Sequence, residues 1–297
     1  MVRAGGRPGY GARLTGPGSI LAGRYRLERR LGEGAAGIVW LARDMRERGL
    51  VWAIKELDFD MFAPGERGEA LDLFEREASM LMRLRHESLP RVVDRFTEQG
   101  REYLVMERVE GPTLDQILAA RGGPLEEKDV IVWGVQLCNV LQYLHNLNPP
   151  VVYRDLKPSN VMVHREGGKV KLIDFGIARR ATPTRKGDTA AYGTPGYAPP
   201  EQYAGHAEPR SDLYALGVTL YQLLTARDPQ ASGFKFRPAR VHNRGVSELM
   251  EALLADCLQH ETVRRPSSAV EVRERLFQAA AQQVRPWKKL LRRLFNP

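Results

Sequence analysis

Alternating apolar and polar residues fill the first third of the chain and predict β-strands. A period of two residues is the pattern of a strand with one buried face. Such runs lie at 24–34, 38–44 and 50–58 and, as a hairpin, at 91–109. Residues 68–84 differ, because their apolar positions repeat at helical spacing. We therefore expect a small sheet accompanied by one helix.

Amphipathic helical patterns dominate the rest of the chain, at 125–147, 211–226, 246–258 and 268–282. Two short β-like pieces, 160–164 and 169–175, lie between the first two of these segments. The change of character falls near 107–111, where we expect a hinge. The predicted organisation is a flexible N-terminal arm, a first lobe, a second lobe and a tail, at residues 1–22, 23–108, 109–282 and 283–297.

The composition is that of an ordinary globular chain, with 297 residues, 43% of them hydrophobic and 27% charged. The only two cysteines, Cys138 and Cys257, lie far apart in apolar helical patterns. We expect buried thiols in a reducing compartment and no zinc site. The Gly- and Arg-rich start lacks the apolar stretch of a signal peptide, and no run is long enough to span a bilayer. These features predict a cytoplasmic protein.

The net charge of +9 favours anionic partners. Much of it lies in the tail, where apolar residues recur at helical spacing and basic residues fill the opposite side. Three interpretations stay open for residues 285–297: packing on the second lobe, contact with an anionic membrane or partner, and a segment next to a membrane span. Membrane contact would place the protein at the inner face of the membrane. We expect no nucleic-acid binding, because no other basic patch is interleaved with aromatic residues.

Two features of the first lobe suit a bound nucleotide. The stretch "GEGAAGIV" places Gly32, Gly34 and Gly37 between two predicted strands, where glycine lets backbone N–H groups approach phosphate closely. Lys55 ends an apolar strand, and a buried ammonium needs an anionic partner. Glu75 and Glu77 both flank the apolar stripe of the following helix, and helical geometry does not choose between them.

The second lobe carries the other groups that phosphoryl transfer requires. In "RDLKPSN", Asp155 would orient a hydroxyl or accept its proton, and Lys157 would neutralise the transferred group. Asn160 and the Asp174 of "DFG" would hold a metal ion, since Mg²⁺ prefers oxygen ligands. We expect ATP and Mg²⁺, with Mn²⁺ as an alternative metal.

These motifs, in this order, resemble the eukaryotic-type protein kinase superfamily from about Tyr25 to Phe277, and most of all its bacterial serine/threonine kinases. The further elements "GTPGYAPPEQ", "SDLYALG" and "RRP" follow in family order. The resemblance implies an α+β, bilobal protein-kinase-like fold. It would have a small antiparallel-sheet N-lobe with one helix and a larger, mainly helical C-lobe.

The resemblance also assigns roles to further residues. It selects Glu77 as the partner of Lys55, because the family glutamate stands nine residues before the histidine that is His86 here. Thr194 resembles the threonine that meets the catalytic aspartate and lysine, and Asp212 the aspartate that holds the catalytic loop. Glu201 and Arg265 should form a buried ion pair. The residues implied in nucleotide binding are Gly32, Gly34, Gly37, Val39, Ala53, Lys55, Met106, Glu107 and Val109.

Regulation is implied at two positions. Arg154 resembles the arginine that receives a phosphorylated activation loop, and Thr189 is the first choice for autophosphorylation among the threonines that follow "DFG". Tyr153 departs from the family, which has histidine there. Tyrosine can also fill the site and form hydrogen bonds, so we interpret the change as variation in a supporting position.

The expected function is a serine/threonine protein kinase that transfers the γ-phosphate of ATP to hydroxyl groups of proteins. A homodimer is expected if the chain phosphorylates its own activation loop. One alternative is a pseudokinase scaffold that binds nucleotide or partners without efficient catalysis. Another is a small-molecule kinase, which the "GTPGYAPPE" element argues against, because relatives of that kind usually lack it.

Overall fold

The computed structural model of the protein describes residues 15–34, 37–57, 67–165, 167–174 and 193–282. By its internal contacts the chain divides into two compact units. The first comprises Met1–Met61 and Val92–Arg108, and the second Phe62–Arg91 and Val109–Pro297.

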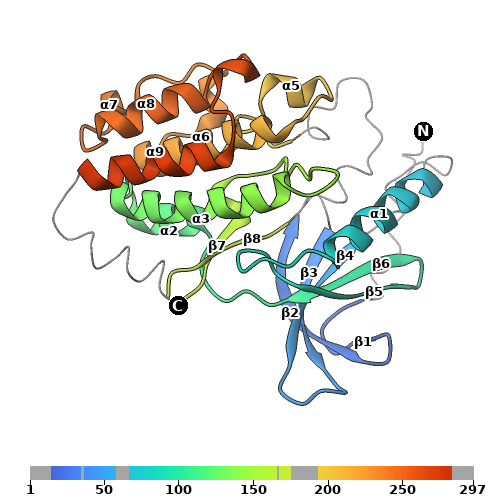
Figure 1. Ribbon diagram of the computed structural model, residues 1–297. Coiled ribbons are helices and arrows are strands. Elements are labelled where there is room, and N and C mark those ends of the chain that lie inside the picture. Colours follow the sequence, from blue (N-terminus) through green and yellow to red (C-terminus); the bar gives the residue numbers. More distant parts are fainter. Residues whose placement is uncertain (1–14, 35–36, 58–66, 166, 175–192, 283–297) are drawn as a thin grey trace, which may run out of the picture. The chain divides into compact units, whose positions relative to one another are not determined.

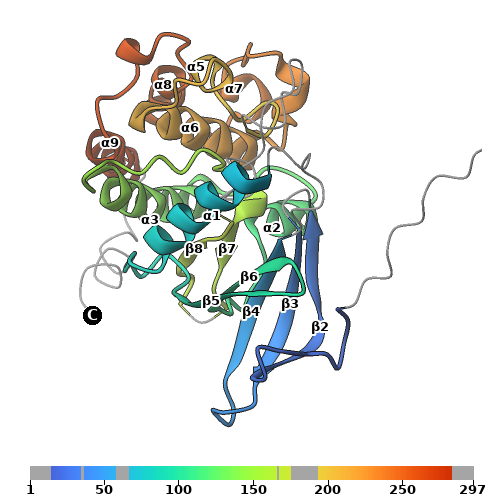
Figure 2. The same cartoon turned by 90° about the vertical axis from the view of Figure 1, so that its right-hand side faces the viewer.

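The first unit contains an antiparallel sheet with strand order β1-β2-β3-β4-β6-β5 (Figure 1). Its strands are β1 (Ile20–Leu21), β2 (Tyr25–Gly34), β3 (Gly37–Asp44), β4 (Val51–Leu57), β5 (Val92–Glu98) and β6 (Arg101–Glu107). Figure 2 shows β2, β3 and β4 running side by side, as their pairing requires. The alternating runs in the sequence predict every strand except β1.

One face of this sheet carries a hydrophobic cluster. Trp40, Ile54 and Val105 stand directly opposite one another on β3, β4 and β6, and residues in such register share a face. All three are buried, and Leu27 of β2 joins them. The opposite face is therefore carried by the residues that alternate with these along each strand.

The start of the chain differs from the expected flexible arm, 1–22, because order begins earlier than Arg24. The Thr15 hydroxyl donates to the buried carboxylate of Glu56, at 2.9 and 3.0 Å from its two oxygens. Leu21 pairs with Tyr25 and is buried against the sheet. The surrounding glycines and proline give no alternating pattern, so the sequence did not predict this short strand.

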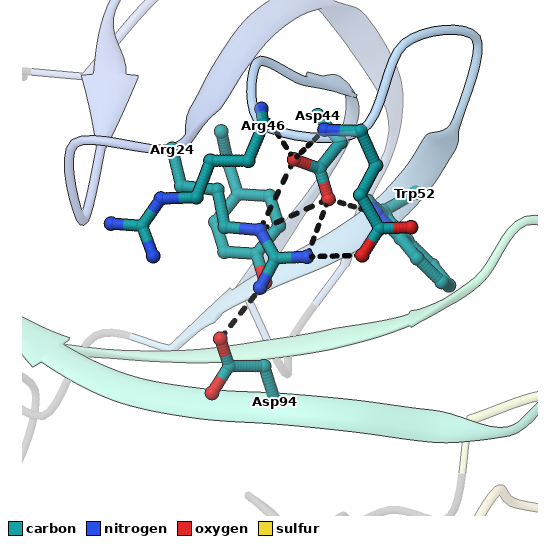
Figure 3. Close-up of polar contacts among 7 residues, drawn as sticks. Arg24, Asp44, Arg46, Trp52 and Asp94 are labelled. Atoms are coloured by element: carbon teal, nitrogen blue, oxygen red, sulfur yellow. Dashed lines mark hydrogen bonds and ion pairs between the residues drawn. The ribbon is translucent and has the colours of Figure 1, made fainter.

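A polar network fixes the end of β3 (Figure 3). The Arg24 guanidinium donates to both carboxylate oxygens of Asp44, and the Trp52 indole N–H donates to the same group at 3.1 Å. Backbone N–H groups of Arg46 and Glu47 add to it. Arg24 is the main reason that the pKa of Asp44 lies well below its usual range.

The second unit is mainly helical. Its helices are α1 (Arg67–Leu81), α2 (Leu114–Arg121), α3 (Glu127–His145), α5 (Pro200–Tyr203), α6 (Pro209–Thr225), α7 (Ala239–His242), α8 (Glu248–Cys257) and α9 (Ala269–Gln282). Its 3₁₀ turns are η2 (Pro158–Asn160), η4 (Pro229–Ser232) and η5 (Thr262–Arg264). A hairpin of β7 (Val161–Val163) and β8 (Val170–Leu172) follows η2.

Helix α6 lies at the centre of the helical packing, and it contacts both α3 and α8. Helix α9 contacts the same two helices (Figure 1). Gly217 allows α6 and α8 to approach closely, because a Cβ there would lie 2.6 Å from the Cβ of Cys257. Cys138 and Cys257 are buried free thiols. Burial raises the pKa of Cys257 to about 12, so it stays protonated at neutral pH.

The predicted α+β fold, with an antiparallel sheet and a mainly helical remainder, is confirmed. Helix α2 was not predicted, although Thr113 and Gln116 form a capping box at its start. The predicted first lobe, 23–108, differs from the first unit in that α1 falls within the second unit. The lobe boundaries therefore stay a prediction. Among the helices described, none has the length and apolar character needed to cross a membrane.

Candidate active site

The glycine turn of the first unit joins β2 to β3. Gly34 pairs with Gly37, and Gly32 with Val39. Gly37 has a φ of +117°, and a Cβ there would lie 2.0 Å from the carbonyl oxygen of Glu56. Glycine is therefore the only residue that fits at position 37 without movement of β4. Residues 35–36, at the tip of the turn, lie outside the described residues.

The strand residues expected at the nucleotide share one face of the sheet. Lys55 stands opposite Val39 on β3, and Ala53 stands opposite Met106 on β6. Because Ala53 and Lys55 are two residues apart on β4, all four side chains point to the same side. This is the face opposite the Trp40 cluster. Lys55 is buried, with 6% of its surface exposed.

The other residues expected near the nucleotide are Glu107, Val109 and Glu77. Glu107 ends β6 opposite Trp52, and Val109 begins the second stretch of the second unit. Glu77 lies on α1, but its side chain is outside the described residues. Glu75, on the same helix, is exposed. The choice of Glu77 as the partner of Lys55 therefore stays a prediction.

The structure brings three predicted side chains of the second unit into contact. The Thr194 hydroxyl donates to Asp155 Oδ1 at 2.6 Å, and Lys157 Nζ donates to that hydroxyl at 2.6 Å. Lys157 Nζ is also 3.2 Å from Asp155 Oδ2. The Asp155 side chain is 5% exposed. One carboxylate is thus held by a hydroxyl and an ammonium from two distant segments.

Asn160 completes this cluster. Its side-chain N–H₂ group donates to Asp155 Oδ2 at 2.8 Å and to the Asp155 carbonyl at 2.9 Å. The backbone N–H of Ile173 donates to the Asn160 carbonyl at 2.9 Å. Asp174 follows directly, in a left-handed conformation with φ of +63°. Asp174 is therefore preceded by a residue, Ile173, whose backbone is hydrogen-bonded to Asn160.

The buried carboxylate of Asp212, in the first turn of α6, holds the loop from below. It accepts the backbone N–H groups of Tyr153 and Arg154, both at 2.8 Å, and His145 Nε2 is also 2.8 Å away. Arg154 has a φ of +71°, which is rare for a residue other than glycine. Such a conformation persists only where the surroundings impose it, and Asp212 supplies part of that constraint.

Tyr153 ties the loop to the segment before Asp174. Its side chain is fully buried, and its hydroxyl donates to the backbone carbonyl of Ile173. The tyrosine thus bonds to the residue that precedes Asp174. A supporting role for this position is compatible with the contact.

Glu201 and Arg265 form an ion pair with two hydrogen bonds, of 2.6 and 3.0 Å, in which Arg265 is buried and the Glu201 side chain is 16% exposed. The Ser211 hydroxyl donates to Glu201 at 2.7 Å, and Arg265 also donates to the carbonyls of Gln259, His260 and Arg210. Burial alone would raise the pKa of Glu201, but the hydrogen bonds from Arg265 and Ser211 outweigh it, so the pKa is lowered. The pair fixes α5 against the start of α6.

The sequence interpretation missed two residues that contact this site. His145 ends α3 and reaches Asp212, and its position at the end of a buried helical stripe was the available signal. Gln202 on α5 donates to the Arg154 carbonyl at 2.8 Å. It directly follows Glu201 and is the last residue of the "GTPGYAPPEQ" element, but the sequence interpretation gave it no role. Thr189 and residues 285–297 lie outside the described residues.

Comparison with known proteins agrees with this geometry. Residues 25–278 match the family described as protein kinase domain. The chain belongs to this family. The resemblance seen in the motifs is thereby confirmed, and so is the fold that it implies.

Two curated bacterial proteins illustrate the similarity of this kinase domain to known kinases. It is 34% identical over 283 residues to serine/threonine-protein kinase pkn2 of Myxococcus xanthus, covering 88% of this chain and 33% of that protein. It is 36% identical over 214 residues to serine/threonine-protein kinase PrkC of Bacillus subtilis, covering 71% of this chain and 32% of that one. The chain thus spans about a third of the length of these two relatives.

Solved structures show the same fold. The kinase domain of Mycobacterium tuberculosis PknI superimposes with a TM-score of 0.73 at 26% identity, covering 90% of this chain and 99% of that one. The apo form of PpkA-294 superimposes with a TM-score of 0.75 at 24% identity, covering 89% of this chain and 100% of that one.

Proposed function

We propose that this kinase domain is an active serine/threonine protein kinase that transfers the γ-phosphate of ATP to hydroxyl groups of protein substrates. The observation that supports this best is the contact of Asp155, Lys157 and Thr194 within 2.6–3.2 Å of one another. A carboxylate and an ammonium held together in this way suit a reaction in which a hydroxyl must be oriented and a phosphoryl group neutralised.

In this mechanism Asp155 accepts the proton of the substrate hydroxyl, and the oxygen forms a bond to the γ-phosphorus as the bond to the β-phosphate oxygen breaks. Lys157 stabilises the negative charge on the transferred group. Thr194 donates to Asp155 Oδ1, so it helps to fix the orientation of the carboxylate. General acid–base assistance of this kind contributes about 10²–10⁴-fold to a rate.

The residues present also suit a divalent cation. Because the Asn160 N–H₂ group donates to Asp155, the amide oxygen is the end of Asn160 that can bind a metal. With a carboxylate oxygen from Asp174 it forms an all-oxygen donor pair, which Mg²⁺ or Mn²⁺ accepts. The metal would neutralise charge on the ATP phosphates. A metal held by two protein ligands takes the others from phosphate and water.

The regulation and partners of the domain follow from the same proposal. Arg154 would receive a phosphate on the activation segment, with Thr189 as the first candidate, and transfer between two copies would require a homodimer. The preference for serine and threonine rests on Lys157 and Thr194, which resemble the residues of serine/threonine-specific relatives. The basic residues 285–297 would bring the domain to an anionic membrane surface or to a partner.

The test is an incubation of the purified protein with labelled ATP and Mg²⁺, beside Asp155→Asn and Lys55→Met variants. We expect phosphothreonine within residues 182–194 of the parent, mapped by mass spectrometry. Each variant should lose transfer by roughly 10²-fold or more, because it lacks the proposed base or the phosphate-binding cation. Removal of divalent cations by EDTA should abolish transfer, and separate additions of Mg²⁺ and Mn²⁺ then identify the effective metal.

Equal labelling of the parent and both variants would reject the proposal, because the label would come from another enzyme. Labelling confined to tyrosine would reject the serine/threonine specificity. Binding of ATP without transfer by the parent would favour the pseudokinase alternative. Circular dichroism and melting temperature of each variant serve as controls for folding.

A further inference from the structure

Four consecutive residues of the Asp155 loop have their peptide groups held by side chains. Asp212 accepts the N–H groups of Tyr153 and Arg154, and Asn160 donates to the Asp155 carbonyl. The Thr219 hydroxyl donates to the Leu156 carbonyl at 3.4 Å. These partners belong to α6 or to the loop itself.

The remaining bond comes from a different element. Gln202 Nε2, on α5, donates to the Arg154 carbonyl at 2.8 Å, and Gln202 is 4% exposed. The Arg154 carbonyl belongs to the peptide that joins Arg154 to Asp155, while Asp212 holds the N–H of Arg154. Arg154, the left-handed residue, is thus hydrogen-bonded through its N–H to Asp212 and through its carbonyl to Gln202. A small rotation of this peptide would turn the Asp155 carboxylate.

Gln202 also contacts the segment that carries Thr194. A Cβ at Gly193 would lie 2.6 Å from Gln202 Nε2 and 3.7 Å from the Arg154 carbonyl oxygen. The backbone at Gly193 therefore packs directly against the hydrogen bond between Gln202 and Arg154. The next residue, Thr194, donates to Asp155. One amide group thus connects the substrate-side segment with the loop of the proposed base.

We propose that Gln202 is a positioning residue that sets the orientation of Asp155 and couples it to the Gly193–Thr194 segment. This inference rests on the proposed kinase activity. Gln202 acts through the Arg154 peptide, and the amide is required because it combines a donor for a buried carbonyl with zero charge. A group that only filled space could be replaced by any side chain of the same length.

The test uses two substitutions of similar size. Gln202→Met removes the donor, and Gln202→Glu replaces it at neutral pH by a carboxylate that faces the carbonyl. We expect kcat to fall between roughly ten- and a hundredfold in both variants, because a misplaced reacting group has losses of this size. KM for MgATP should change less than about twofold, since Gln202 acts on orientation and not on uniform binding.

The pH dependence separates positioning from packing. When the introduced carboxyl of Gln202→Glu is protonated, its O–H can donate to the Arg154 carbonyl as the amide does. Burial beside a carbonyl should raise the pKa of that carboxyl above the usual value of about 4.3. The kcat of Gln202→Glu relative to the parent should therefore rise as the pH falls from about 8 to 5. The relative kcat of Gln202→Met should stay constant.

Asn243→Asp is the matched control. Asn243 Nδ2 also donates to a backbone carbonyl, that of Leu224, at 2.8 Å, but at the far end of α6. We expect a comparable change in melting temperature and an unchanged kcat. Parent-like kcat in folded Gln202→Met, or an equal loss in Asn243→Asp, would overturn the inference.

The two proposals can fail separately. An inactive parent would reject the proposed function, and hydrogen exchange would then decide the positioning role. Exchange within residues 151–157 should be faster in Gln202→Met than in the parent and in Asn243→Asp. Unchanged exchange in that peptide would overturn the role of Gln202 whatever the activity.

Discussion

Tyr153 stands where the family resemblance leads one to expect histidine, and its hydroxyl bonds to the carbonyl of Ile173. The motif alone left open whether the substitution removes a support or replaces it. The contact favours replacement, because the tyrosine bonds directly to the residue before Asp174. The contribution of Tyr153 to stability is therefore that of one partly buried hydrogen bond, which a stability measurement can detect.

We predict that Tyr153→Phe lowers the free energy of unfolding by about 0.5–1.5 kcal/mol, because it removes this partly buried hydrogen bond. Urea denaturation of the parent and the variant measures the change. Tyr214→Phe is the matched control, since Tyr214 is also fully buried but its hydroxyl has no hydrogen-bond partner among the described residues. That variant should be as stable as the parent or more stable. Equal losses would show that the Ile173 bond contributes nothing.

The sequence predicted those side chains that lie within short motifs, and the structure brings Asp155, Lys157 and Thr194 into contact. It did not predict His145 or Gln202. His145 bonds to Asp212, which lies 67 residues later, and Gln202 bonds to the Arg154 carbonyl, 48 residues earlier. A single polar residue on a helix carries no signal of its target. Contacts of this kind follow from packing, which a local pattern does not encode.

The short helix α5 depends on an ion pair for its position. Glu201 lies on α5, and Arg265 follows η5 some sixty residues later. The Arg265 guanidinium is also 4.8 Å from the centre of the Tyr214 ring on α6. Arg265 thus connects α5, α6 and the segment after η5, so the loss of the Glu201 charge should destabilise the packing of all three.

We predict that Glu201→Gln lowers the free energy of unfolding by roughly 3–5 kcal/mol at neutral pH, because it leaves a buried guanidinium without its counter-charge. The lowered pKa of Glu201 adds a pH dependence. A carboxyl with a lower pKa in the folded state stabilises the fold above its unfolded pKa, and this stability is lost as the pH falls through the folded value.

The difference in stability between the parent and Glu201→Gln should therefore narrow between about pH 5 and pH 3. Chemical denaturation at several pH values measures it. A constant difference over this range would contradict the lowered pKa. Glu248→Gln is a suitable control, because Glu248 is exposed and its ion pair with Arg240 lies at the surface.

The long helices and the strands from β2 to β8 were predicted well, and the short elements α2 and β1 were not. The 3.6-residue period identified α3, α8 and α9 because each buries one stripe over several turns, whereas α6, also predicted as amphipathic, is buried on nearly all sides. Helix α2 has only eight residues, and β1 has two. In these two elements the period was not recognised, whereas the three-residue strands β7 and β8 were predicted as two pieces joined by a turn.

The whole chain carries a net charge of +9, and its last residues are strongly basic. The matched region makes up about a third of the full length of pkn2 and of PrkC. The proposed contact of residues 285–297 with an anionic membrane can be tested directly.

We predict that the full chain sediments with liposomes containing anionic lipid, and that a chain ending at Gln283 does not. Basic residues near an anionic surface each contribute about 1 kcal/mol, and the apolar side of the segment adds burial. Liposomes of neutral lipid and 0.5 M salt are the controls, because charge attraction fails in both. Equal sedimentation of the two chains would exclude the tail as the membrane-binding segment.

The short N-terminal segment that includes Thr15 and β1 has a practical consequence for any shortened form of this domain. Similarity to the family begins at residue 25, but the hydroxyl that reaches Glu56 and the leucine that covers the sheet lie upstream of it. A chain trimmed where the similarity starts would lose one of the hydrogen bonds to the Glu56 carboxylate, which Trp40 and Arg101 also contact, and would expose an apolar edge. Trimming by homology would thus remove part of the protein's own scaffold, and a loss of activity there would say nothing about catalysis.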